Sequence, residues 1–528
     1  MKTRYAYNID KCQFVMAAVM LLLPSLLFAH GNRRFINGHW FDGKTFVDQE
    51  VYSVEGTLRG QFQGETETVD LHGGYVIPPF AEAHTHEFTA TFDAPLDRYL
   101  SQGIFYARNL NGVLELTDAV RPLVNNAESV DVAWAGAGIT SSGGHPVQIF
   151  DAVAAQLKWP PARMRNQAYW IADNEKELSE IWPAILASKP AVIKAYLEHS
   201  EEYEKRRKDP AFYGKRGLSP AVLKAVVRRA HAAGLPVSVH IDTAADFRNA
   251  VLAGADDIAH LPLEPLTPAD AQLAAEKGVW VVTTTLSHRP TPGISDIDSL
   301  HAGNLALLRQ AGVRVALGTD SSHSVVDEIE NVRRLGVFSD LQLLRMATMD
   351  SARLVFPKRK IGCLTDGCEA SFLVLQGNPL TDFANIHRID LRVKTGHVLP
   401  TPAGALPSIA THLGELLSKH SIDEVVAAYR SLRKSESGKW NFSEPQLNAL
   451  GYQLLKEGKK VEAVAIFTLN VEMFPASANA YDSLGEALES TGDHDGAIAN
   501  YEKVLAIAPG NVNATKMLET IRGKKAPE

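Results

Sequence analysis

Short apolar runs alternate with longer amphipathic stretches through the middle of the chain. The apolar runs have the length of buried strands, and helical stretches such as residues 220–233, which ends before Gly234, separate them. Alternating strands and helices predict a parallel sheet, and over about 280 residues a (β/α)8 barrel of the TIM type is the economical arrangement. We expect its strands at residues 75–78, 103–107, 130–134, 191–195, 236–241, 257–261, 279–284 and 314–317.

Two strand-rich stretches flank this central segment. The first has strand patterns at residues 34–38, 50–54 and 66–71, and the second has them at 371–375 and 393–398. Fragments from both sides of a long insertion predict one small domain, which we expect to be a β-sandwich. The expected boundaries are residues 30–77 and 357–400 for this β domain and 78–356 for the barrel.

A repeat follows a proline-containing linker and helix, which we place at residues 401–440. The repeat covers residues 441–528, and its period of 34 residues is typical of tetratricopeptide helix pairs. Two repeats are few for a stable array, so we expect them to lean on the barrel or on the helical stretch 409–432. Such arrays offer a surface for a protein or peptide partner. The recurring positions are Leu450-Gly451, Ala463, Phe467 and Pro475, repeated as Leu484-Gly485, Ala497, Tyr501 and Pro509.

The first 29 residues differ in character from the rest. A net-basic start precedes an uncharged run at residues 14–29, which is shorter than the roughly 20 residues of a membrane-spanning helix. This pattern predicts a secretory signal cleaved before His30, hence a periplasmic or secreted protein, with an uncleaved anchor as the alternative. No second apolar span is evident, so we expect no stable membrane span. The net charge of −8 disfavours a nucleic-acid partner.

Two of the three cysteines, Cys363 and Cys368, lie on either side of an Asp-Gly pair. If that pair turns the chain, the two sulfurs can meet, and an oxidising compartment would permit the bond. A disulfide between them is therefore a hypothesis of the sequence.

Potential metal ligands occur at the ends of five expected barrel strands. His84 and His86 follow the first strand at a spacing that puts both side chains on one side of it. Imidazole and carboxylate groups are ligands that hold Zn²⁺ and leave a position for water. Each motif alone has a plain structural alternative: a chance histidine pair, a lysine in a salt bridge, a turn. Their conjunction in this order favours a metal site made by His84, His86, His240, His260 and Asp320, with Lys194 at the end of another expected strand.

These motifs resemble those of the amidohydrolase superfamily, in particular its imidazolonepropionase-like and prolidase-like branch. The resemblance covers about residues 33–400, through VIPPFAEAHTHEF, VIKAYL, PVSVHIDTAADFRNAVLAGADDIAH, VALGTDSS and the closing IGCLTDGCEASFLVLQGNPLTDF. It implies two divalent metal ions, for which zinc suits the ligands. His84, His86 and Asp320 would bind one ion and His240 and His260 the other. Lys194 would be carboxylated and bridge them, a feature that single-metal deaminases lack.

The implied reaction is hydrolysis of a C–N amide-type bond in a dipeptide, an N-acyl amino acid or a cyclic amide, with an ester or lactone as further alternatives. A hydroxide shared by the metals would attack the carbonyl, and Asp320 would shuttle its proton. His145, in a glycine-rich loop, either contacts the small-molecule substrate or faces solvent. Tyr196, His199, His288 and His323 are weaker candidates for pocket or neighbouring positions. The rival hypothesis is a catalytically decayed barrel that serves, with its helical repeats, as a binding platform.

Overall fold

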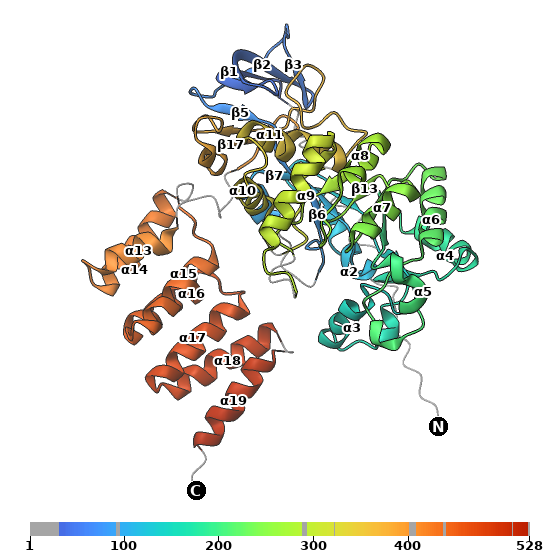
Figure 1. Cartoon of the computed structure of the whole chain (residues 1–528). Helices are drawn as coiled ribbons and strands as arrows, with labels where there is room; N and C mark the ends of the chain where they lie inside the picture. Colours follow the sequence, from blue (N-terminus) through green and yellow to red (C-terminus); the bar gives the residue numbers. More distant parts are fainter. Residues whose placement is uncertain are drawn as a thin grey trace, which may run out of the picture.

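The computed structural model describes residues 31–90, 96–287, 293–321, 323–400, 408–436, 440–508 and 511–525. Along the chain follow a β-rich part, an α/β core and a series of helices, coloured from blue to red in Figure 1. The expected signal at residues 1–29 lies outside the described residues, as do residues 401–407 and 437–439 of the expected linker segment. None of the described helices combines the length and apolar character needed to cross a membrane.

Both flanks contribute strands to one small domain, as the sequence predicts, but these strands form a single hydrogen-bonded sheet rather than the two packed sheets of the expected β-sandwich. The strand order is β18-β17-β16-β5-β1-β2-β3, with β4 paired to β1, so all eight strands share a single hydrogen-bonded sheet. Phe372 from the later flank packs its ring 5.0 Å from the rings of Phe35 and Trp40 from the earlier one. The bounds are β1 Arg33–Phe41, β2 Phe46–Val54, β3 Thr57–Arg59, β4 Glu67–Asp70, β5 Tyr75–Ile77, β16 Phe372–Leu375, β17 Ile389–Lys394 and β18 His397–Val398.

The first barrel strand does not lie at residues 75–78, where the sequence predicts it. Residues Tyr75–Ile77 form β5, which pairs with β1 and β16 in the flanking sheet. The first core strand is instead β6, Phe80–Thr85. Pro78 and Pro79 separate the two strands, and because proline has no backbone N–H, it interrupts a strand ladder. An apolar run that looks continuous in the sequence therefore serves two different sheets.

The α/β core consists of two parallel sheets, with the orders β6-β7-β8 and β10-β9-β11-β12-β13-β14-β15. Backbone hydrogen bonds connect these sheets on both sides, from the Ala83 N–H to the Leu317 carbonyl and from the Ala191 N–H to the Trp134 carbonyl. The other seven expected strands are present as β7 Ile104–Asn109, β8 Asp131–Trp134, β11 Ile193–Tyr196, β12 Val237–His240, β13 Asp257–Ile258, β14 Trp280–Val282 and β15 Arg314–Ala316. Two further strands, β9 Gly138–Thr140 and β10 Tyr169–Ile171, were not expected.

Helices between the strands have the start and stop signals that their sequences predict. In α7 the Thr243 side chain accepts the Asp246 N–H in a capping box, and the helix ends at Gly254 with φ +91°. The principal helices are α1 Leu96–Ser101, α2 Leu114–Asp118, α3 Val147–Gln156, α4 Glu175–Ala187, α5 Tyr203–Arg206, α6 Pro220–Ala232, α7 Ala244–Ala253, α8 Pro268–Lys277, α9 Ile297–Ala311, α10 Val325–Arg334, α11 Asp340–Arg345 and α12 Ser351–Val355.

The C-terminal helices form antiparallel pairs, as the 34-residue period predicts (Figure 1). Close packing explains the repeated glycines: a Cβ on Gly451 would lie 2.5 Å from the Phe467 ring, and one on Gly485 would lie 3.1 Å from the Tyr501 ring. Helices α13 and α14 share a buried core with α15 and α16, so the preceding helical stretch supports the array. The bounds are α13 Ile409–Leu417, α14 Ile422–Ser435, α15 Glu444–Lys456, α16 Lys460–Met473, α17 Ala478–Thr491, α18 His494–Ile507 and α19 Val512–Lys525.

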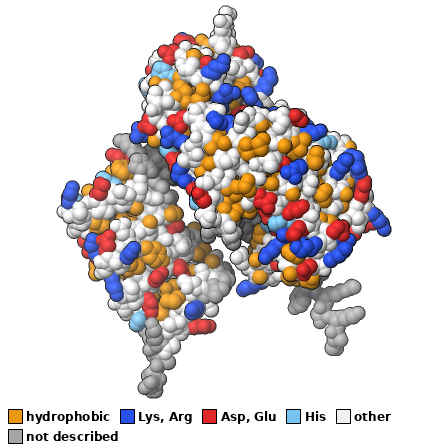
Figure 2. All heavy atoms as spheres, viewed as in Figure 1, with side chains coloured by type: hydrophobic (Ala, Val, Ile, Leu, Met, Phe, Trp, Pro, Cys, Tyr) orange, Lys and Arg blue, Asp and Glu red, His pale blue; other side chains and the backbone are white. Residues whose placement is uncertain are grey.

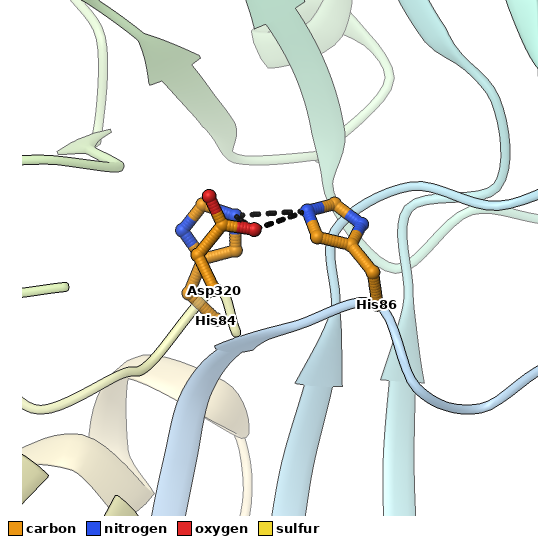
Figure 3. Close-up of side chains that lie close together, drawn as sticks. All are labelled: His84, His86 and Asp320. Carbon is orange, nitrogen blue, oxygen red and sulfur yellow. Dashed lines mark hydrogen bonds and ion pairs between the residues drawn. The ribbon is translucent and has the colours of Figure 1, made fainter. Parts of the chain in front are cut away.

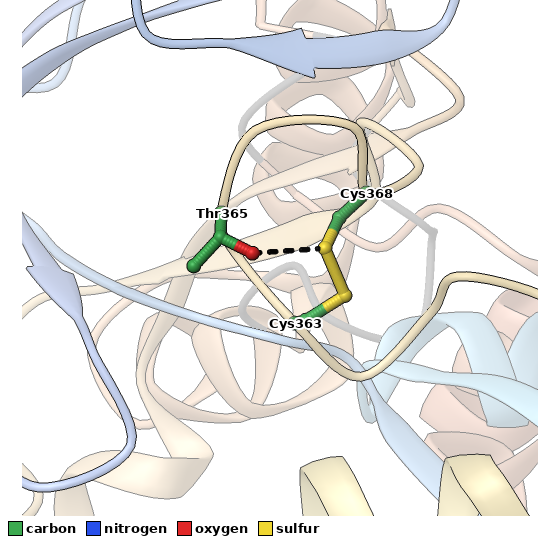
Figure 4. The surroundings of a disulfide bond; sticks show 3 residues. All are labelled: Cys363, Thr365 and Cys368. Atoms are coloured by element: carbon green, nitrogen blue, oxygen red, sulfur yellow. Dashed lines mark hydrogen bonds between the residues drawn. A yellow bond between two sulfur atoms is a disulfide. The ribbon is translucent and has the colours of Figure 1, made fainter.

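Cys363 and Cys368 are joined by a disulfide, in agreement with the hypothesis (Figure 4). The loop between them contacts the flanking sheet, because the Gly367 N–H donates to the Leu58 carbonyl and the Leu58 N–H donates to the Cys368 carbonyl. The bridge therefore fixes a loop that joins the core to the flanking sheet. On the face of the molecule shown in Figure 2, acidic and basic side chains are intermixed.

Candidate active site

One cavity of about 850 Å³ contains every metal or catalytic candidate that the sequence predicts. It lies where the core strands end. His84 is the penultimate residue of β6, His240 closes β12, and the other candidates stand on β11 or follow β6, β9, β13 and β15. Carboxyl ends of parallel strands are where such folds place their reactive groups. The predicted residues among its lining are His84, His86, His145, Lys194, His240, His260 and Asp320.

His84, His86 and Asp320 make the most compact donor group (Figure 3). Their ligand atoms all lie within 4.8 Å of one another. The Nε2 atoms of the two histidines are 3.2 Å apart, and Asp320 Oδ1 lies 2.9 Å from His86 Nε2 and 3.5 Å from His84 Nε2. Three side chains from opposite ends of the core sequence thus converge on one point.

The hydrogen bonds of the other ring nitrogens show what this point can hold. His84 Nδ1 lies 3.0 Å from the Ala259 carbonyl, and His86 Nδ1 lies 3.0 Å from the Asn111 carbonyl. Since a carbonyl can only accept, both Nδ1 atoms carry the hydrogen, and in the neutral rings both Nε2 atoms are lone-pair acceptors. Two such acceptors and a carboxylate oxygen facing one another need a cation between them. The donor set therefore fits a metal ion.

A second pair of histidines adjoins this group. The His260 ring lies 4.8 Å from the His84 ring and 4.6 Å from the His240 ring, measured between centroids. His260 Nε2 lies 3.8 Å from Asp320 Oδ2, so the two oxygens of Asp320 face the two histidine pairs. The His260 Nδ1 is fixed by the Thr284 hydroxyl at 2.9 Å. A second histidine pair thus lies beside the group that could hold a metal ion.

Burial and neighbouring charges shift the pKa values in this cavity. Burial lowers the pKa of the Lys194 amine to about 7, although Asp320 and Asp257 act against it. Burial also holds the pKa of His84 and His240 well below the usual range. Burial alone would raise the pKa of Asp320, but His86, when it is protonated, lowers it overall by its charge and hydrogen bond. Neutral His84 and His240 imidazoles, an ionised carboxylate and an amine that is only partly protonated near pH 7 are the forms suited to bind cations.

His145 faces the cavity, which favours its reading as a substrate contact over a solvent-facing loop histidine. Its ring stacks on the His240 ring at 4.5 Å with an interplanar angle of 12°, and it lies 5.4 Å from the Tyr196 ring. The glycine-rich loop that we expected around His145 is shorter than predicted, because residues Gly138–Thr140 form strand β9. A Cβ on Gly138 would lie 2.4 Å from the Tyr196 ring, so the glycine makes room for this side chain.

Tyr196, a weaker candidate, lines the cavity together with Asn111, which the sequence did not single out. The Asn111 amide donates to the Tyr196 hydroxyl at 2.7 Å, and its backbone carbonyl accepts the His86 ring N–H. A lone asparagine after an apolar strand carries no spacing signal. His199 and His323 lie outside the cavity lining, and His288 lies outside the described residues.

Two buried charged groups hold the ligand strands in place and were also missed. Glu82 accepts the N–H groups of His84 and Thr319 and the Thr319 hydroxyl, which ties the strand end at His84 to the turn before Asp320. Burial raises the pKa of Glu82 to about 8. Arg108 makes a two-pronged contact with Asp257 at 2.8 and 2.9 Å. Charged residues inside otherwise apolar strands were the signal that could have found both.

The amidohydrolase family matches this chain over residues 75–399, and the tetratricopeptide repeat matches residues 478–511. An uncharacterized protein of Mycobacterium tuberculosis is 30% identical over 154 residues, which are 26% of this chain and 41% of that protein. The match thus spans about two fifths of that relative. A 5-methylthioadenosine/S-adenosylhomocysteine deaminase of Halobacterium salinarum is 26% identical over 348 residues, 56% of this chain and 69% of the deaminase.

Solved structures agree with the fold. A crystal structure of an amidohydrolase superposes with a TM-score of 0.56 at 22% identity and covers 70% of this chain and 98% of its own. A prolidase in complex with N-methylphosphonate-L-proline has a TM-score of 0.56 at 20% identity, with coverages of 70% and 99%. A Xaa-Pro dipeptidase with bound methionine has a TM-score of 0.54 at 17% identity, with coverages of 70% and 99%. At these identities the likeness concerns the fold.

Proposed function

Because the chain belongs to the amidohydrolase family, we propose that it is a hydrolase of C–N amide-type bonds that works with two divalent metal ions, zinc in the first place. The observation that carries the proposal is the convergence of His84 Nε2, His86 Nε2 and Asp320 Oδ1, three acceptors around one point. Prolidase and dipeptidase structures with the same fold support the bond type. The expected substrates are dipeptides, N-acyl amino acids and cyclic amides.

The donor set divides naturally between two positions. His84, His86 and one oxygen of Asp320 would hold one ion, and His240 and His260 would hold the other. When bound, such a pair of ions supplies water of lowered pKa and polarises the substrate carbonyl. Imidazole and carboxylate ligands in this number suit zinc with a position left open.

Lys194 can join the set only in a modified form, because an ammonium group would repel cations. The lowered pKa leaves a large share of the amine neutral near pH 7, and a neutral amine attacks carbon dioxide. A new N–C bond forms as one C=O π bond of carbon dioxide opens, one proton passes from the nitrogen to water, and the product is a carbamate whose single negative charge is shared by two oxygens. Each oxygen can then serve one of the two positions.

Asp320 is the proposed proton carrier. Its two oxygens face both histidine pairs, at 2.9 Å from His86 Nε2 and 3.8 Å from His260 Nε2. Its lowered pKa keeps the carboxylate ionised, and the ionised form is the one that can take a proton from the attacking water. It can then return the proton to the leaving nitrogen. His145, stacked on His240, is placed to contact the substrate carbonyl or its neighbouring group.

The test combines metal content with turnover. Zinc-loaded protein should hold about two equivalents of metal and hydrolyse members of an amide panel. His84→Ala should lose metal, whereas Asp320→Asn should lose turnover far more than metal. His323→Ala is the matched control, because His323 is exposed and lies three residues beyond Asp320.

The rival proposal is a binding platform that has lost its chemistry. Protein that holds less than one equivalent of zinc and cleaves no amide would favour the platform and end the hydrolase proposal. Retention of most of the wild-type kcat by Asp320→Asn would remove Asp320 from the mechanism. Deleting residues 441–528 would show whether the helical repeats serve turnover or, as we propose, a protein or peptide partner.

We also propose that the protein is exported. The basic start and uncharged run of residues 1–29 support this, and so does the Cys363–Cys368 bond, because disulfides persist in oxidising compartments. Fractionation and N-terminal sequencing test it. A mature chain that begins at His30 outside the cytoplasm is expected, and cytoplasmic protein that begins at Met1 would contradict it.

A further inference from the structure

We infer that the amide substrate carries a leucine- or phenylalanine-sized apolar group, seated against one wall of the active-site cavity. This inference rests on the proposed function and deepens it by naming a substrate class. The wall, which we call the α3 wall, consists of Val113, Leu116, Ile149, Phe150, Val153 and Leu157.

The α3 wall belongs to the same cavity as the histidine and Asp320 group. The cavity of about 850 Å³ has the size of sites for small molecules, which are typically a few hundred to about 1,000 Å³. The reactive groups and the six apolar side chains line this one cavity. A substrate whose carbonyl reaches the reactive groups therefore has apolar surface available in the same cavity.

An exposed isoleucine in the wall offers apolar surface that a substrate group can cover. Ile149 keeps 48% of its surface accessible, although it adjoins partly buried Phe150 and Val153. Exposure alone is ordinary, since Leu252 on α7 is 58% exposed; what distinguishes Ile149 is that it lines the cavity that holds the reactive groups. Covering it with a substrate group would remove apolar area from water, which stabilises the complex by about 25 cal/mol per Å².

The back of the wall is packed, so the wall keeps its shape. Helix α3 and its neighbours form a separate apolar cluster that includes Val147, Ala154, Met164 and Tyr169, and the Phe150 ring lies 6.2 Å from the Tyr169 ring. The wall side chains therefore cannot move away from the cavity into this cluster, because it is already packed.

The wall is also held in register with the reactive groups. The Gln148 amide in the first turn of α3 lies 3.1 Å from His145 Nδ1, and the His145 ring stacks on His240. One short segment thus carries both a candidate substrate contact and the apolar wall. A group next to the scissile bond would meet α3 once the carbonyl is in place.

The test measures kcat/KM with zinc-loaded full-length protein on two amide series. In one series the acyl group grows from acetyl to benzoyl on glycine, and in the other the amine side grows from glycine through leucine to phenylalanine in N-acetyl amino acids. We expect a preference of about 10-fold or more for the larger apolar member in at least one series, the range that a few methylenes give in an apolar pocket.

Ile149→Gln should lower kcat/KM on the larger apolar member about 10-fold more than on N-acetylglycine, and Ile149→Leu should restore the preference. Leu252→Gln is the matched control, because Leu252 is a 58% exposed leucine on α7 outside the cavity lining. No preference in either series, or an equal loss in the control, would overturn the inference while amide hydrolysis stands.

Binding separates this inference from the hydrolase proposal. Calorimetric titration of Asp320→Asn protein with N-acetylphenylalanine and N-acetylglycine measures the wall without turnover. If no amide is cleaved but N-acetylphenylalanine binds about 10-fold tighter and Ile149→Gln abolishes the difference, the wall stands and the hydrolase proposal fails. Equal or absent binding of both compounds would overturn the wall.

Discussion

The ion pair of Arg108 and Asp257 offers a sharp test of how the core positions its ligands. Both side chains are buried, and the guanidinium makes two bonds to the carboxylate and a third, at 2.9 Å, to the Ala83 carbonyl. The Ser238 hydroxyl donates to the same carboxylate at 2.6 Å. Residues from β6, β7, β12 and β13 are therefore linked through one pair, directly beside His84.

Asp257→Asn leaves the Arg108 charge buried without its partner. Breaking a buried pair in this way costs about 3–5 kcal/mol, because the remaining charge has lost both water and counter-charge. Since neutral side chains of similar volume remove both charges, the double variant Arg108→Met/Asp257→Asn should recover part of this loss. Urea unfolding of the metal-free protein, monitored by hydrogen exchange of core amides, measures the change in free energy of unfolding.

The control is the exposed pair Arg163–Glu115, joined at 2.7 Å. Glu115→Gln should cost less than about 1 kcal/mol, the range of exposed pairs. Because Arg108 also holds the carbonyl next to His84, we expect Asp257→Asn to weaken zinc binding as well. A loss below about 1 kcal/mol for Asp257→Asn, or a double variant less stable than the single one, would refute the reasoning.

Three further predictions follow from the structure. Burial raises the pKa of Glu328 from 4.5 to about 7, so its stabilising contribution, present below pH 4.5, disappears as pH rises through 7. Glu328→Gln should reduce the fall in free energy of unfolding between pH 4 and pH 8 by about 3 kcal/mol in urea titrations, and an unchanged fall would contradict this. Gly318→Ala would place a Cβ 2.7 Å from the backbone nitrogen of His84 and should weaken zinc binding at least about 10-fold in a chelator competition. Gly303→Ala, which has open space around it, should not weaken zinc binding. Opening the Cys363–Cys368 loop with serines should cost about 2 kcal/mol in thermal or urea unfolding, and two free thiols in native exported protein would show that the bond is absent.

Spacing and order made much of the site predictable. The His84-Thr85-His86 pair fits the period of a strand, and Lys194, His240 and Asp320 stand where apolar runs end, so parallel strands were bound to bring them to one rim. The repeat was equally legible, because a fixed period needs no knowledge of the fold. Features that repeat or that end an apolar run leave a mark in the sequence.

Other features depend on partners far away in the chain. Strand β9 starts at a glycine that accommodates the Tyr196 ring, a requirement visible only when the two strands are side by side. Asn111 matters because its carbonyl holds His86, and any residue type has a carbonyl. The register of the first core strand depended on two prolines, whose effect on the ladder outweighs the apolar run around them.

The geometry of the donors links metal binding to the stability of the core. In the metal-free protein, the acceptors of His84, His86 and Asp320 face one another, and this arrangement is unfavourable unless a proton or a metal lies among them. The strands nonetheless keep it, because Glu82 and the Arg108–Asp257 pair fix the backbone around His84 from two sides. The bracing therefore opposes a repulsion that a bound cation would relieve. Zinc should consequently raise the unfolding temperature of the wild type by relieving this repulsion. The increase should be smaller in Asp257→Asn, where the loosened strand end can already relax. An equal increase in both proteins would show that the Arg108–Asp257 pair does not hold the acceptors together.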